Sequence, residues 1–194
     1  MNRLLHVVML GLMLCRTLQA GKPDPNNRPQ LTVCVYNFAR VSDATLTRAM
    51  SQTVRMFEES GIDLLWISVE ISGEASLPAH RCKRLILGRT QQRTDISPKT
   101  QGLTVKAHSA WVFYDHVESF VAYSGHLPAL RGFGGKAGIL SVVIAHELGH
   151  MMGLSHTKRG IMKASLDSSA WQQMSFTREE SKTLQMAVNE MVTK

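Results

Sequence analysis

The chain has 194 residues, of which 44% are hydrophobic and 19% are charged, and its formal net charge is +7. This composition is that of an ordinary globular protein, and the length is sufficient for one sizeable hydrophobic core. The basic residues are scattered, and their densest group, at Arg81, Lys83 and Arg84, has no interleaved aromatic side chains. We therefore do not expect a nucleic-acid-binding surface.

The first twenty residues have the pattern of a secretory signal peptide. Arg3 precedes an apolar run from Leu4 to Leu14, and the small residue Ala20 ends the segment. An uncleaved membrane anchor is one alternative, but an apolar run of about a dozen residues is shorter than the roughly 20 that a spanning helix needs. Lipid attachment at Cys15 is another. We expect residues 1–20 to be a signal peptide, the mature chain to be secreted or periplasmic, and no stable membrane insertion.

Cleavage after Ala20 would leave Cys34 and Cys82 as the two cysteines of the mature chain. Two cysteines in an exported protein suggest one disulfide bond. Two buried free thiols are the alternative, because bridging depends on a Cα separation that the sequence does not show. The sequence leaves the pairing open.

The mature chain is expected to begin with an extended lead-in over residues 21–30, which are rich in Pro and Asn, followed by a single folded domain over residues 31–194. Leu31 to Phe38 is rich in β-forming residues and is predicted to be a strand, and Ile62 to Ile71 is predicted to be a second one.

A helix is predicted between these two strands. Ser42 or Asp43 can cap it, and it should end near Gly61. Four apolar residues recur at helical spacing within it: Leu46, Met50, Val54 and Phe57. A strand, a helix and a strand in this order suggest a right-handed parallel crossover and an α/β fold.

Three more strands and a Gly-rich connection follow. The strands are expected at Arg84 to Leu87, Gly102 to Ala107 and Ala110 to Phe120, and the last of these is dense in aromatic and β-branched residues in its first half. The connection spans Gly125 to Gly135.

The last predicted element is a helix near the C-terminus. Ser175 or Thr177 can cap it, and Glu180 completes a Thr-x-x-Glu capping box. Its expected apolar face consists of Leu184, Ala187, Val188 and Met191.

The segment from Gly138 to Met152, GILSVVIAHELGHMM, is apolar enough to be a buried helix. His146 and His150 are four residues apart in it and therefore lie on one face, where two imidazoles can share one metal ion. Glu147 lies on nearly the same side, where a carboxylate can reach a metal-activated water without being a ligand. This is the arrangement that metal-assisted hydrolysis needs.

A third ligand is available shortly after this helix. Gly153 lets the helix end and the backbone reverse, and His156 follows three positions later. Three protein ligands leave one zinc position open, which distinguishes a catalytic site from a closed structural site. A chance His-Glu-x-x-His occurs in on the order of one chain in 200 of this length, and the added Gly and His make a chance match far rarer.

The sequence HELGHMMGLSH, from His146 to His156, resembles the extended zinc signature of the metzincin clan of metallopeptidases. Gly160, Ile161 and Met162 resemble the clan's Met-turn. The short interval before Met162 is similar to that of the matrixins, in which Thr157 would occupy the family-marking position, although matrixins commonly have Ser there.

The resemblance implies an α/β fold in which a mixed twisted sheet with one antiparallel edge strand is combined with an active-site helix and a C-terminal helix. It implies one catalytic Zn²⁺ bound by His146, His150 and His156, Glu147 as general base, and Met162 as an apolar floor. The implied activity is that of a monomeric secreted zinc endopeptidase acting on polypeptides. By order of elements, the segment Gly102 to Ala107 would be the edge strand beside which the substrate binds.

Two alternatives remain open. The third ligand could come from Glu179 or Glu180, as in the other large class of helical zinc peptidases, or the chain could be a secreted zinc-binding protein without turnover. Three other histidines stand outside any ligand spacing, and two tyrosines could assist an oxyanion, but packing or loop roles are favoured for all of them. These residues are His108, His116, His126, Tyr114 and Tyr123.

Overall fold

The structure is a computed structural model, and it describes residues 28–69, 82–92, 102–105, 108–124, 134–164 and 174–192. The expected signal peptide, most of the lead-in and most of the Gly-rich connection lie outside the described residues. None of the described helices combines the length and the apolar character that crossing a membrane requires.

The first three elements agree with the prediction. Strand β1 spans Gln30–Asn37, helix α1 spans Asp43–Glu59, and strand β2 spans Asp63–Ser68 and pairs with β1 in parallel. The helix ends where Gly61 takes a φ of +77°, a left-handed conformation that favours glycine. Ser42 precedes the helix as predicted, but its hydroxyl lies 3.0 Å from Thr45 Oγ1 and does not cap a backbone N–H.

The sheet is completed by β3 (Lys83–Gly88), β4 (Gly102–Val105) and β5 (Ser109–Phe113). The strand order is β2-β1-β3-β5-β4. All neighbouring pairs are parallel except β4 and β5, so β4 is an antiparallel edge strand. This is the mixed sheet with one antiparallel edge that the sequence predicted.

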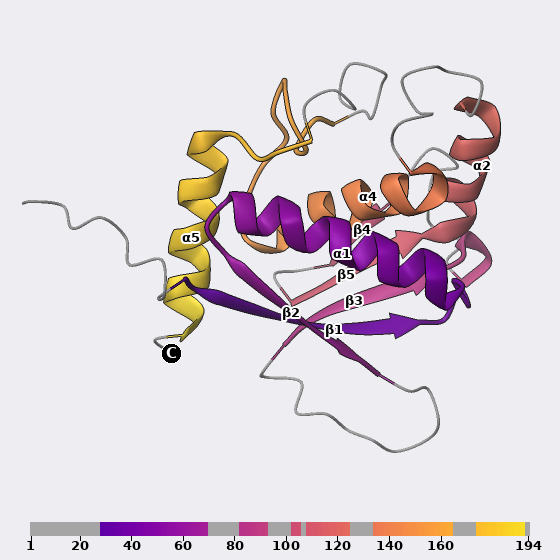
Figure 1. Cartoon of the computed structure of the whole chain (residues 1–194), viewed down its shortest axis with the longest axis horizontal. Coiled ribbons are helices and arrows are strands. Elements are labelled where there is room, and N and C mark those ends of the chain that lie inside the picture. The colour runs from indigo at the N-terminus through magenta and orange to yellow at the C-terminus, as the bar shows by residue number, and fades with distance from the viewer. Residues whose placement is uncertain are drawn as a thin grey trace, which may run out of the picture.

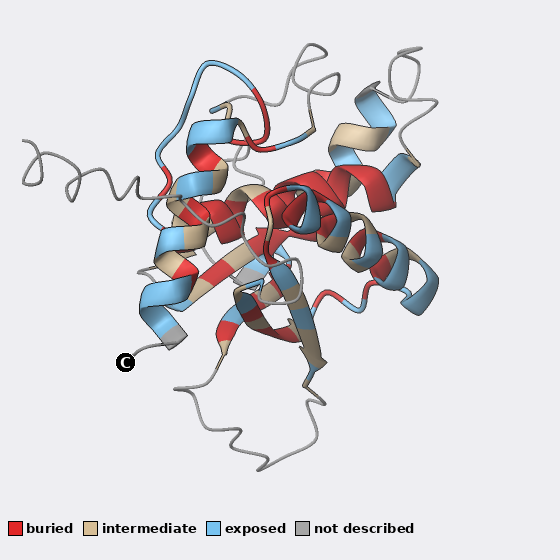
Figure 2. Ribbon diagram, turned by 60° about the vertical axis from the view of Figure 1, so that its left-hand side comes forward, coloured by how far each residue is buried: buried red, intermediate tan, exposed pale blue. Residues whose placement is uncertain are grey.

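The hydrophobic core lies between the sheet and the helices α1 and α4 (Gly135–Met151) (Figure 1). In the three central strands, β1, β3 and β5, side chains that face these helices are buried: Val33, Leu85 and Val112 have no exposed surface. Helix α4 is apolar on nearly all sides and is buried over most of its length (Figure 2). Such a helix has a rigid, water-poor environment, which suits it to hold functional side chains in fixed positions.

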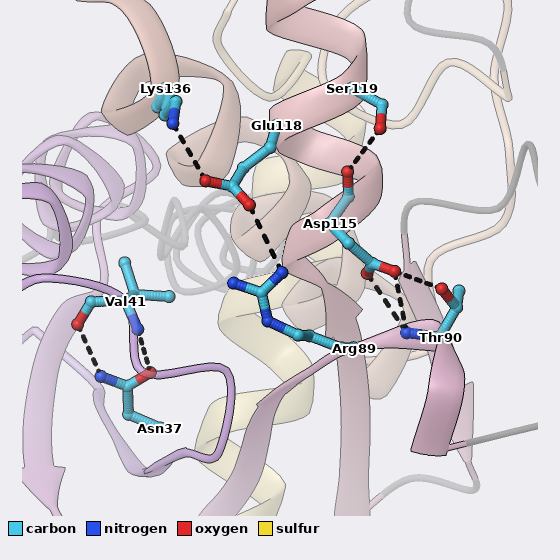
Figure 3. Close-up of polar contacts among 8 residues, drawn as sticks. All are labelled: Asn37, Val41, Arg89, Thr90, Asp115, Glu118, Ser119 and Lys136. Atoms are coloured by element: carbon cyan, nitrogen blue, oxygen red, sulfur yellow. Dashed lines mark hydrogen bonds and ion pairs between the residues drawn. The ribbon is translucent and has the colours of Figure 1, made fainter.

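The predicted strand from Ala110 to Phe120 is wrong in its second half. Strand β5 ends at Phe113, and Tyr114–Ser124 forms helix α2. Asp115 stabilises this change of direction, because its carboxylate accepts hydrogen bonds from the backbone N–H and the hydroxyl of Thr90 (Figure 3). Val117 is fully buried in the first turns of the helix. The β-branched and aromatic residues are densest in the first half of the predicted segment, which does form the strand, whereas the second half forms the helix.

The C-terminal helix α5 spans Arg178–Val192, and its predicted capping box is confirmed. The backbone N–H of Thr177 donates to Glu180 Oε2 at 2.7 Å, and the N–H of Glu180 lies 3.2 Å from Thr177 Oγ1. Leu184 and Val188 are buried as expected, whereas Met191 is 37% exposed and does not belong to the core.

Cys34 in β1 and Cys82, directly before β3, form a disulfide bond with a Cα separation of 5.7 Å. This decides the question that the sequence left open. The two cysteines meet because β1 and β3 are parallel neighbours, with Cys34 in register with Arg84. A disulfide is consistent with an exported protein.

Candidate metal centre

Helix α4 carries His146 and His150 one turn apart near its C-terminal end, and each ring is oriented by a backbone carbonyl. Nδ1 of His146 lies 2.8 Å from the carbonyl oxygen of Ile161, and Nδ1 of His150 lies 2.8 Å from that of Leu154. A carbonyl oxygen only accepts hydrogen bonds, so both Nδ1 atoms carry the proton. In the neutral rings, both Nε2 atoms therefore present a lone pair.

The Nε2 atoms of the three histidines converge. His150 Nε2 lies 3.0 Å from His146 Nε2 and 3.1 Å from His156 Nε2, and the three ligand atoms all lie within 4.8 Å of one another. The Nε2 atoms of His146 and His150 cannot hydrogen-bond to each other, because both are acceptors in this tautomer. A cation bound between them would offset the repulsion of the two lone pairs.

The donor set fits zinc. Three imidazole nitrogens are a common set of protein ligands for Zn²⁺, and a tetrahedral site with Zn–N bonds of about 2.0–2.1 Å separates its nitrogens by about 3.3 Å. The two short Nε2 separations, 3.0 and 3.1 Å, are near that value.

Burial keeps His146 and His150 in the form that can bind a metal. Desolvation lowers the pKa of His146 to about 4, despite the opposing hydrogen bond with Ile161, and it also lowers the pKa of His150. Both imidazoles are therefore neutral at pH 7, so binding a metal there requires no loss of a proton from either ring.

The chain after α4 folds back beneath the histidines. Gly153 takes a φ of +87°, which lets the backbone reverse and bring His156 to the other two rings. Met162 is fully buried, and a Cβ built on Gly149, within α4, would lie 2.5 Å from its sulfur. Met162 therefore packs closely against the helix between the turns that carry His146 and His150.

A second short connection closes this loop. The backbone N–H of Thr157 donates to the carbonyl oxygen of Met162 at 2.9 Å. The hydroxyl of Thr157 has two acceptors, the carbonyl oxygen of Arg159 at 2.7 Å and Glu180 Oε1 at 3.0 Å, so the residue after His156 contacts both its own loop and α5.

Glu147 is the acidic side chain next to the first histidine, and it is only 4% exposed. Its Oε2 accepts a hydrogen bond of 2.8 Å from the hydroxyl of Thr104 in β4. Burial raises the pKa of Glu147 to about 7, although the Thr104 hydrogen bond acts in the opposite direction. A carboxylate with such a pKa can both accept and return a proton at neutral pH.

The alternative third ligands do not reach the histidines in this arrangement. Glu180 is buried, and its carboxylate engages Thr157 and Thr177, while Glu179 is exposed. His156 is the residue that completes the cluster.

The other candidate residues lie elsewhere or outside the described residues. His108 and His116 are not members of the cluster, and Tyr114 is buried at the start of α2. Tyr123 is 87% exposed, and His126 lies outside the described residues.

Sequence reasoning missed two contacts at the site. One is the hydrogen bond from Thr104 to Glu147, and the other is the contact between Thr157 and Glu180. Neither contact has a signal in the sequence, because its two residues are far apart along the chain.

No protein-family model matches the chain, and no curated protein matches its sequence. Among solved structures, the chain is similar to archaemetzincin from Methanopyrus kandleri, with 13% sequence identity and a TM-score of 0.50. The match covers 84% of this chain and 96% of that one. The chain has a metzincin-like fold. This likeness does not test the resemblance to matrixins, which stays a prediction.

Proposed function

We propose that this chain is a secreted zinc-dependent endopeptidase in which His146, His150 and His156 hold one catalytic zinc ion. The observation that carries the proposal is the convergence of three Nε2 atoms, with two of the rings fixed by the carbonyls of Ile161 and Leu154. Such a set leaves one zinc position open for the reaction.

Bound zinc would polarise the scissile carbonyl and acidify the attacking water. Glu147 then takes the proton of the attacking water and delivers it to the leaving amine, so it acts first as base and then as acid. Its buried position and its pKa of about 7 suit both roles. Met162 supports the ligands from beneath as a nonreacting apolar side chain.

The proposed substrate is a polypeptide bound along β4. Among the described strands, β4 pairs with β5 alone and is the last strand in the sheet order, so we propose that a substrate strand adds to its other edge. Its residue Thr104 contacts Glu147, so a peptide lying along β4 would pass close to the general base.

Export of a monomeric mature chain is the remaining part of the proposal. It rests on the pattern of residues 1–20 and on the disulfide between Cys34 and Cys82. Mass spectrometry of the chain expressed with its own N-terminus tests this part: export predicts a product that begins at Gly21.

Cleavage of a broad peptide library by the mature chain, with bound metal quantified, tests the activity. We expect the wild type to bind one zinc ion per chain and to cleave peptides. The Glu147→Gln variant should still bind zinc but should no longer cleave them. Gln can still accept the Thr104 hydrogen bond, so this variant removes the base with little structural change. A wild type that binds zinc and cuts no peptide would reduce the chain to a zinc-binding protein, and a chain that binds no zinc would refute the proposal.

A further inference from the structure

Two residues of the edge strand face the catalytic carboxylate. Gly102 and Thr104 are two positions apart in β4, so they lie on the same side of the strand, and both are next to Glu147 in α4. The hydroxyl of Thr104 lies 2.8 Å from Glu147 Oε2 and 3.1 Å from the Glu147 carbonyl oxygen. The shorter distance assigns the hydroxyl proton mainly to the carboxylate.

Gly102 brings the backbone of β4 close to this side chain. A Cβ built on Gly102 would lie 2.6 Å from both Cγ and Cδ of Glu147, a distance at which the glutamate would have to move. The glutamate side chain therefore occupies the space that any other residue at position 102 would fill.

These two contacts restrict a side chain that has three rotatable bonds. A glutamate reaches different positions with each rotamer, and a general base must lie within hydrogen-bond distance of the proton it accepts. The Thr104 hydroxyl holds one carboxylate oxygen of Glu147 at the strand. The backbone at Gly102 limits where the rest of the Glu147 side chain can lie.

We propose that Thr104 is a positioning residue for Glu147, and that Gly102 provides the space in which the positioned carboxylate lies. The inference rests on the proposed role of Glu147 as general base. It assigns the edge strand a part in the reaction in addition to the binding of substrate.

The kinetic test compares three zinc-loaded variants of the mature chain with the wild type. Thr104→Val keeps the shape and removes the hydroxyl, Thr104→Ser keeps the hydroxyl, and Thr32→Val makes the same chemical change in β1, away from the site. We expect kcat of Thr104→Val to fall roughly 10- to 100-fold with KM and zinc content unchanged, because a misplaced catalytic group loses rate rather than binding. Thr104→Ser and Thr32→Val should keep kcat near the wild-type value.

Gly102→Ala provides a second variant that leaves Thr104 in place. Its Cβ should displace the glutamate side chain and lower kcat as Thr104→Val does, with little change in Tm, because the displaced group is the end of a flexible side chain. A purely structural role for Gly102 would instead lower Tm and leave kcat of the folded fraction unchanged.

The carboxyl carbon resonance of Glu147, followed by ¹³C NMR in zinc-loaded protein and assigned with Glu147→Gln, provides a readout that does not depend on activity. It should shift in Thr104→Val and Gly102→Ala and stay near its wild-type position in Thr104→Ser and Thr32→Val. An unshifted resonance with unchanged kcat in Thr104→Val would overturn the inference, and so would a rise in kcat, since Thr104 would then hold the base away from its place. If the wild type cleaves no peptide, the proposed function fails, and the resonance alone decides whether Thr104 positions Glu147.

Discussion

The hydroxyl of Thr157, the residue directly after His156, lies 3.0 Å from Oε1 of the buried Glu180 in α5. The other carboxylate oxygen of Glu180 accepts the backbone N–H of Thr177 at 2.7 Å. One buried side chain therefore caps the C-terminal helix and holds the loop of the third candidate ligand. A helix later in the chain therefore contacts the residue next to His156.

Removing the Glu180 carboxylate should weaken zinc binding. Loss of a partner that orients a metal ligand typically lowers metal affinity about 10- to 100-fold, and we expect the lower part of this range for Glu180→Ala because His156 itself remains. Competition with a chromophoric chelator measures the affinity. Glu179→Ala, at the exposed neighbouring position, is the matched control and should bind zinc as the wild type does. Equal affinities in the two variants would show that α5 does not position the ligand loop.

Zinc should stabilise the folded chain through all three histidines. A ligand that binds only the folded state adds about 2.7 kcal/mol to stability when its free concentration is 100 times Kd. We expect a chelator to lower the Tm of the wild type and added zinc to restore it. His156→Ala should bind zinc much more weakly and show little such shift, whereas a full zinc response in His156→Ala would mean that another residue supplies the third ligand.

The disulfide between Cys34 and Cys82 should contribute substantially to stability. The bond joins residues separated by 48 positions, and a loop of that length corresponds to about 4 kcal/mol when its entropy is removed from the unfolded chain. The double variant Cys34→Ala/Cys82→Ala should therefore unfold at a lower urea concentration than the wild type, by an amount equivalent to roughly 2–5 kcal/mol. Reducing agent should destabilise the wild type and leave the double variant unchanged. Equal stability of the wild type and the double variant in urea would contradict this.

Asp115 should make the stability of the fold depend on pH in the acidic range. Burial alone would raise the pKa of this carboxyl, but hydrogen bonds from the hydroxyl and the N–H of Thr90, with the nearby His116, outweigh burial and hold the pKa below its usual value (Figure 3). A depressed pKa in the folded state stabilises the fold above the unfolded pKa of about 4, and this contribution is lost as the pH falls through the folded pKa.

Urea unfolding of the wild type and Asp115→Asn at a series of pH values tests this effect. At pH 7 the variant should be less stable by about 1 kcal/mol, because the carboxylate is only partly shielded from water. The difference should shrink as the pH falls below about 4. A difference that does not change with pH would assign the loss to the shape of the side chain rather than to its charge.

The sequence alone was sufficient for the parts of this protein that depend on short separations along the chain. Within a helix, residues four apart must share a face, so the pairing of His146 and His150 follows from their spacing. The capping box at Thr177 and Glu180 is likewise a contact over three residues, and it was predicted correctly. The order of strands and helices followed from composition, except that the strand predicted from Ala110 to Phe120 extended into the first turns of α2.

Only the tertiary structure decided the contacts between distant segments. Thr104 and Glu147 are 43 residues apart, and their hydrogen bond depends on how the edge strand β4 packs against α4. The disulfide from Cys34 to Cys82 likewise depends on β1 and β3 being neighbours in the sheet, and the tie from Thr157 to Glu180 depends on where α5 packs. Local geometry is set by bond rotations within one or two turns, whereas these contacts are set by the packing of whole elements, which no spacing in the sequence encodes.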